Sequence, residues 1–147
     1  MNRVGLILLL ALPACMPTGP STLESLESNR ALWEERRPDV YEFTLQRTPC
    51  ECPPEWRAPT RVTVHQRQIR RALNVETGLS VPVDSRHVMT IDDLFDLVEH
   101  ALLGNAFRVN VTYDDEFGYP RSIYIDYHAN AVDDEVGLNA YELRAVE

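Results

Sequence analysis

The chain has 147 residues, of which 44% are hydrophobic and 25% charged, and its formal net charge is −9. This size and balance fit one globular domain with a short extension, and they exclude an intrinsically disordered chain. The excess of acidic residues repels phosphate backbones, so the composition disfavours nucleic acid as a partner.

The first 15 residues, MNRVGLILLLALPAC, have the pattern of a bacterial export signal that ends in a lipidation site. The apolar run from Val4 to Leu12 is nine residues long, whereas a membrane helix needs about 20. Small Ala14 precedes Cys15, as at a site where the cysteine is acylated with palmitate or a similar chain. We therefore expect a signal peptide over residues 1–14; the alternative is an ordinary cleaved signal with an incidental cysteine.

The predicted anchor also predicts where the protein resides. Residues 15–22 are expected to form the lipidated cysteine and a polar tether, and residues 23–147 a single α+β domain. Met16 stands where an Asp would resemble an inner-membrane retention signal. The expected location is the bacterial cell envelope, on the periplasmic face of the outer membrane if the host has two membranes. The membrane, contacted through the lipid anchor, is the first expected partner.

The first half of the domain begins with a predicted helix over about residues 22–36. Ser21 and Glu24 have the spacing of a capping box, and Pro38 stops the helix. A period of two then replaces the helical period, which indicates half-buried strands. The predicted strands cover residues 40–47, 61–65 and 69–73, and a Pro-rich loop covers residues 48–60.

The second half begins with a predicted helix that has Thr90 as its N-cap and ends at Gly104. Alternating segments at 107–113 and 122–127 then predict a hairpin, and residues 136–146 predict a final edge strand. The sequence therefore predicts an α+β fold in which an antiparallel sheet of about five to six strands has two helices packed on one face. A helix followed by three strands occurs twice, without residue-level identity between the halves.

Several segments of the predicted strands and loops carry a resemblance to a known family. They are Tyr41–Leu45, Cys50–Cys52, Arg61–Val64, Thr90–Phe95, Val111–Asp114, Gly118–Ile123 and Ile125–Glu135. In this order they resemble a family of uncharacterised bacterial lipoproteins carrying a domain of unknown function, over about residues 30–145. The resemblance implies an envelope location and a fold type. It implies no activity and no role for any residue.

Cys50 and Cys52 flank a single Glu in the Pro-rich loop. Residues two apart in an extended strand have Cα atoms about 6.5 Å apart, at the long end of disulfide geometry, but the neighbouring prolines can bend the segment. A structural disulfide is the first interpretation; a thiol-exchange role and two free thiols are the alternatives. The pair alone supplies too few ligands for zinc, unless a histidine such as His65 joins it.

An acidic segment near the C-terminus is a candidate calcium site. Its oxygen donors are Asp126, Asp133, Asp134 and Glu135, which Asp114 or Asp115 could supplement. The segment departs from a calcium-binding loop, because Ala131 stands where that loop requires Gly. The alternative is a solvated acidic loop, and no other cofactor is expected.

Three aromatic residues in loops are candidates for contact with a partner. Trp56 lies in the Pro-rich loop, and Phe117 and Tyr119 lie in an acidic loop. Exposed aromatic side chains are common in interfaces. The alternative is that Phe117 and Tyr119 fold back as a lid on the sheet.

The chain has no Gly-x-Ser-x-Gly elbow, no His-Glu-x-x-His pair and no phosphate-binding Gly loop. We therefore predict a noncatalytic, lipid-anchored envelope module that binds an unknown protein or small ligand. The alternatives are a cell-envelope enzyme with a carboxylate site, or a thiol role at Cys50 and Cys52.

Overall fold

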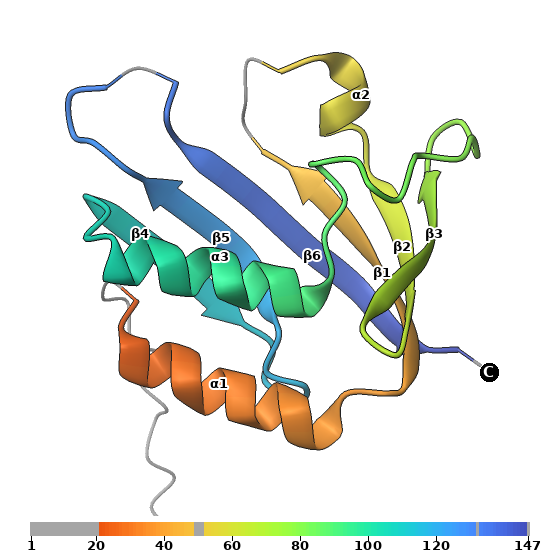
Figure 1. Cartoon of the computed structure of the whole chain (residues 1–147), viewed down its shortest axis with the longest axis horizontal. Helices are drawn as coiled ribbons and strands as arrows, with labels where there is room; N and C mark the ends of the chain where they lie inside the picture. The colour runs from red at the N-terminus through yellow and green to blue at the C-terminus, as the bar shows by residue number, and fades with distance from the viewer. Residues whose placement is uncertain (1–20, 49–51, 132, 147) are drawn as a thin grey trace, which may run out of the picture.

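The computed structural model describes residues 21–48, 52–131 and 133–146. These residues form one six-stranded antiparallel sheet and three helices, which confirms the predicted α+β class (Figure 1). The strand order across the sheet is β3-β2-β1-β6-β5-β4. The elements are α1 (Leu23–Arg36), β1 (Val40–Arg47), α2 (Pro54–Arg57), β2 (Thr60–His65), β3 (Gln68–Asn74), α3 (Ile91–Leu103), β4 (Arg108–Tyr113), β5 (Pro120–Asp126) and β6 (Val136–Ala145).

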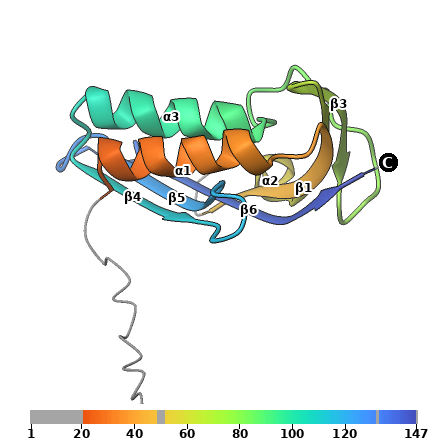
Figure 2. The ribbon, with the colours of Figure 1, turned by 90° about the horizontal axis from the view of Figure 1, so that it is seen from below.

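The sheet consists of two meanders, β1–β2–β3 and β4–β5–β6, which join where β1 pairs with β6. Figure 2 shows α1 and α3 running side by side along the same side of the sheet. Across the sheet, the order β3-β2-β1 is followed by β6-β5-β4, so both meanders run in the same direction relative to their order in the sequence.

Alternate strand residues and one face of each long helix form the apolar core. Trp33 of α1 is 0% exposed, and its ring meets the Tyr41 ring of β1 edge-on, with 5.2 Å between the centroids. The indole Nε1 of Trp33 also donates to Asp92 Oδ1 at 3.4 Å, which links α1 to α3. The helix α3 contributes a buried stripe with helical spacing, made of Ile91, Leu94, Phe95, Val98 and Ala101.

Both long helices begin with a capping box, one as predicted and one shifted. Thr90 caps α3, accepting from the Asp93 amide at 3.0 Å while the Asp93 carboxylate accepts from the Thr90 amide at 2.7 Å. The α1 cap is Thr22 with Ser25, one residue later than the predicted pair. The reason is that Ser21 is already bonded to the sheet edge, where its amide donates to the Val109 carbonyl of β4 at 3.0 Å.

Two further predictions about elements are wrong. The segment expected as an edge strand is β6, which lies between β1 and β5 in the middle of the sheet. Its burial of Leu138 and Ala140 fits this central place, but position in the chain does not reveal position in a sheet. The Pro-rich loop also contains a short helix, α2, which Pro54 can begin because proline tolerates the first helical turn.

Candidate functional site

A small cleft of about 240 Å³ lies between the end of β1, the helix α2 and the loop before α3. Its lining joins three segments that are distant in the sequence. The lining residues are Arg47, Trp56, Ser85, Arg86 and His87. We call this hollow the Arg47 cleft.

The helix α2 forms one wall of the Arg47 cleft and carries Trp56, which is 39% exposed. The Trp56 amide donates to the Pro53 carbonyl at 2.9 Å, and the Ala58 amide donates to the Pro54 carbonyl at 3.1 Å, closing the helical turn. Gln46 of β1 donates to the Arg57 carbonyl at 3.4 Å, which fixes α2 against the sheet. Proline-rich sequence and these bonds therefore hold Trp56 at the rim.

The loop before α3 forms the opposite wall. The Ser85 amide donates to the Pro82 carbonyl at 3.1 Å, and the Val88 amide donates to the Ser85 carbonyl at 2.9 Å. Buried Val88 anchors this turn in the core. The turn places His87 against Trp56, with their rings stacked at 5.7 Å between centroids and 22° between planes.

The cleft is cationic although the chain as a whole is acidic. The Nε of Arg47 is buried and has no hydrogen-bond partner among the described residues. Neither Arg47 nor Arg86 forms a salt bridge within the described ranges. Burial lowers the pKa of the Arg47 guanidinium from its usual value. A buried, unsatisfied N–H is costly, so this donor favours an anion that would accept its hydrogen bond.

The surroundings of His87 favour its neutral form. Burial, followed by the positive charge of Arg47, lowers the pKa of His87 below its ordinary value of 6.5, while Glu55 acts in the opposite direction. A neutral imidazole can donate one hydrogen bond and accept another. The cleft therefore offers two guanidinium groups, one imidazole, the Ser85 hydroxyl and an aromatic plane.

The two arginines of the cleft indicate that its ligand carries an anionic group. The planar guanidinium of arginine donates two parallel hydrogen bonds to carboxylate, phosphate or sulfate oxygens. The described residues that line the Arg47 cleft include no carboxylate, although the charge of Glu55 acts on His87. The arrangement fits the binding of a small anion or of one anionic group on a larger molecule.

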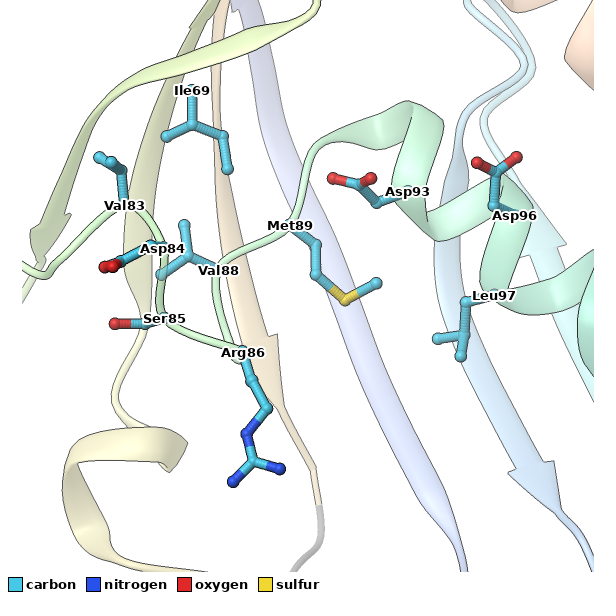
Figure 3. Close-up of a pocket in the computed structure, with 10 residues that line it drawn as sticks. All are labelled: Ile69, Val83, Asp84, Ser85, Arg86, Val88, Met89, Asp93, Asp96 and Leu97. Carbon is cyan, nitrogen blue, oxygen red and sulfur yellow. The ribbon is translucent and has the colours of Figure 1, made fainter.

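A second, wider hollow of about 500 Å³ lies on the other side of the loop that carries Arg86 (Figure 3). Two of its three carboxylates have partners, because Asp93 belongs to the α3 capping box and Asp96 lies 3.1 Å from Arg30; the third is Asp84. Figure 3 shows the Arg86 side chain extending away from Ile69. The hollow shares Ser85 and Arg86 with the Arg47 cleft but lacks Arg47, whose buried Nε has no partner among the described residues, so we treat the cleft as the candidate site.

The structure separates the three loop aromatics that were candidates for a partner contact. Trp56 lines the cleft, but Tyr119 is only 4% exposed and meets Trp33 at 6.3 Å between ring centroids. Phe117 is half-buried and packs on the core. Of the two interpretations of Phe117 and Tyr119, their burial fits the one in which they fold back onto the domain rather than the one in which they are exposed anchors, because Gly118, at φ +78°, turns the loop toward α1.

The acidic segment does not assemble as a calcium site. Asp126 ends β5, whereas Asp133, Asp134 and Glu135 precede β6, and Asp134 is paired with His128 at 2.7 Å. In the described part of the chain, no group of three His, Cys, Asp or Glu side chains could hold a metal ion. The prediction of a metal site at these four carboxylates is therefore not supported by their geometry.

The predicted lipidation site and one of the paired cysteines lie outside the described residues. These are Cys15 and Cys50, so lipidation and the Cys50–Cys52 bridge stay predictions. Cys52 itself is disulfide-bonded. Across residues 21–48, 52–131 and 133–146, no helix has the length and apolarity needed to cross a bilayer.

Sequence reasoning missed Arg47, Arg86 and His87. Arg47 has the pattern of an ordinary strand end, and the other two lie in a segment without clear periodicity. Only Trp56 was singled out, and no local signal joined it to the others.

The fold and the cleft define a single-sheet α+β domain. The chain belongs to a family of unknown function (DUF6174), which matches residues 25–145. No curated protein and no solved structure matched the chain.

Proposed function

We propose that the protein is a lipid-anchored, noncatalytic module of the bacterial cell envelope that binds a small anionic ligand in the Arg47 cleft. The observation that carries the ligand class is the buried Nε of Arg47, which has no partner among the described residues, beside Arg86 and the stacked rings of Trp56 and His87. The net charge of the chain is −9, yet the two arginines of the cleft form no salt bridge within the part of the chain that the structure describes, and a binding function explains this arrangement.

Support for the anchor comes from the sequence alone. The short apolar run, Ala14 and Cys15 favour acylation at that cysteine, and Met16 favours the periplasmic face of an outer membrane where one exists. Packing of both long helices on one face of the sheet, as the sequence predicts, would leave the loops of the cleft free at the periphery of the domain. Mass spectrometry of the mature protein tests the acylation directly.

The size of the cleft limits what it could bind. About 240 Å³ lies below the range of roughly 300–1,000 Å³ that drug-sized ligands occupy. We therefore expect a carboxylate, phosphate or sulfate group, either free or at the end of a larger ligand. The disulfide on Cys52 disfavours a free thiol at that position.

Calorimetric titrations with sulfate, phosphate and succinate test the ligand class. We expect saturable binding by the wild-type protein, with a change in Trp56 fluorescence because that ring lines the cleft and is partly exposed. Arg47→Gln and Arg86→Gln should each weaken binding about tenfold or more, since hydrogen bonds to charged groups contribute about 1.5–3 kcal/mol.

The matched control is Arg121→Gln, which removes an exposed arginine of β5 that does not line the cleft. It should leave the affinity unchanged. If none of the three anions binds saturably, or if Arg121→Gln weakens binding as much as Arg47→Gln, the proposed ligand class is wrong.

A further inference from the structure

Three exposed apolar side chains gather at one end of the molecule. The start of α1, the end of α3 and the start of β4 lie together there (Figure 1). Leu103 is 62% exposed and Phe107 is 56% exposed, and Leu23 is exposed nearby at the start of α1. The guanidinium of Arg108 lies over the Phe107 ring, 5.6 Å from its centroid, which is within the distance of about 6 Å at which a cation and a ring attract each other. We call these four residues the terminal patch.

The terminal patch borders a hollow of about 650 Å³. Ser21, Leu102 and residues 105–110 line it. This surface is not part of the buried core, because the side chains of Phe107 and Leu103 are exposed to solvent. Large apolar side chains that cluster in this way commonly mark a contact surface.

The N-terminal segment enters the domain at this same surface. The Ser21 amide donates to the Val109 carbonyl at 3.0 Å, and the Val111 amide donates to the Ser21 hydroxyl at 2.8 Å. These two bonds fix the entry point on the edge strand β4. Cys15 precedes Ser21 by six residues, so it reaches at most about 20 Å from this point.

We propose that the terminal patch rests on the phospholipid surface that holds the acyl chains of Cys15. This inference rests on the proposed lipid anchor. Leucine and phenylalanine side chains enter the boundary between headgroups and acyl chains, and Arg108 can donate to a headgroup phosphate. The net charge of −9 opposes adhesion to anionic lipid. The contact therefore depends on the short tether and the apolar side chains, and zwitterionic lipid suffices.

This contact would orient the Arg47 cleft. His87, which lines the cleft, lies just before the first residue of α3, and Leu103 of the terminal patch is the last residue of α3. The 13 residues of α3 separate the two ends by about 20 Å. A domain that rests on its terminal patch thus turns the cleft away from the lipid surface, toward the soluble contents of the compartment.

Tryptophan fluorescence on vesicles tests the proposal. The acylated variant Phe107→Trp is reconstituted into phosphatidylcholine vesicles, with or without brominated acyl chains, and compared with Leu79→Trp. Leu79 is the matched control because it is 69% exposed in the loop that follows β3, away from the terminal patch. After subtraction of wild-type emission, we expect a blue shift and bromine quenching at position 107, and neither at position 79.

Three results would overturn the proposal. Equal quenching at positions 79 and 107, or quenching at neither, means that the domain has no preferred contact with lipid. A blue shift at position 107 without vesicles means that the N-terminal segment or a second copy of the chain covers the terminal patch.

A second way of attaching the protein to vesicles tests the lipid contact independently of acylation at Cys15. The same variants, starting at Met16 with an N-terminal histidine tag, are attached to vesicles through a nickel-chelating lipid. Quenching at position 107 in this arrangement supports the lipid contact even if mass spectrometry finds Cys15 without an acyl chain. Absence of quenching in this arrangement counts against the contact even if Cys15 is acylated.

Discussion

At the scale of single residues, Trp33 of α1 connects its helix to the sheet and to α3. Its ring contacts Tyr41 of β1 and Tyr119 in the loop before β5, and its Nε1 bonds to Asp92 of α3. Two helices and the sheet therefore meet at one side chain. Replacing it removes packing, aromatic contacts and a hydrogen bond together.

Trp33→Ala should lower the free energy of unfolding by about 3–5 kcal/mol, because a fully buried aromatic side chain leaves a cavity. Urea unfolding followed by circular dichroism measures this change. Trp56→Ala is the control: Trp56 is 39% exposed and its loss should cost about 1 kcal/mol or less. Equal losses for the two variants would contradict the described core.

Gly118 is the residue that turns the aromatic loop back onto α1. It has φ +78°, and an added Cβ would lie 2.5 Å from the carbonyl oxygen of Asn29 and 3.0 Å from the Cβ of Leu32. Gly118→Ala should therefore cost about 2–4 kcal/mol, from backbone strain and from crowding.

Gly78→Ala separates these two causes. Gly78 has φ +71° but nothing within 4 Å of an added Cβ, so only the backbone cost of about 1 kcal/mol should remain. Thermal unfolding of both variants compares the costs. If Gly78→Ala is as destabilising as Gly118→Ala, the close approach of the loop to α1 is wrong.

The lowered pKa of His87 predicts how anion binding depends on pH. Burial and Arg47 favour the neutral form of this group, and protonation would add a positive charge beside the bound anion. A bound anion in turn favours the protonated form, so sulfate affinity should rise several-fold as pH falls below 6.5, the ordinary value. Sulfate keeps its charge over this interval, so the ligand does not contribute to the change.

His87→Gln should abolish this dependence and leave the affinity at pH 7.5 within about threefold of wild type, because His87 is neutral there. Titration calorimetry at several pH values between 5 and 7.5 measures both. An unchanged pH profile in His87→Gln would exclude His87 as the titrating group.

At the scale of elements, α3 is the helix that the sequence describes best. Its N-cap and its end at Gly104 follow from residue types at fixed positions, and both occur as predicted. The α1 cap is shifted by one residue because the Ser21 amide donates to Val109 of β4, a strand that is distant in the sequence. Local pattern predicts what a residue can do, and long-range bonds select among the possibilities.

Thr90→Ala should lower the free energy of unfolding by about 1 kcal/mol, since it removes the side-chain acceptor of the α3 cap. For a domain of this size the melting temperature should fall by about 3–5 °C. Thr112→Ala, at an exposed position of β4, provides the comparison and should change it by less. A neutral Thr90→Ala would mean that the capping box contributes nothing to stability.

At the scale of the whole molecule, the α+β class was predictable but the strand order was not. Alternation identifies Tyr41, Phe43 and Leu45 as the buried face of a strand whatever its neighbours are. It does not reveal that β6, the last strand in sequence, pairs with β1, the first. Sheet order depends on which edges meet during folding, and no local pattern records that.

The Arg47 cleft was hidden from the sequence for the same reason. Arg47 ends a strand, Trp56 lies on a four-residue helix, and Arg86 and His87 belong to an irregular loop. Pairing of β1 with β2 and the turn before α3 bring these segments together. Only Trp56 was a candidate in advance, because an aromatic side chain in a Pro-rich loop is unusual enough to notice.

The most direct measurement of the central claim observes the Arg47 Nε–H itself. A ¹⁵N-labelled sample is titrated with sulfate while the arginine Nε–Hε and tryptophan indole resonances are recorded by NMR. We predict that Arg47, Arg86 and Trp56 shift together and saturate with one binding constant, while Arg121 on β5 shifts little. If the Arg47 and Arg86 resonances move no more than that of Arg121 at any sulfate concentration, the cleft is not an anion site.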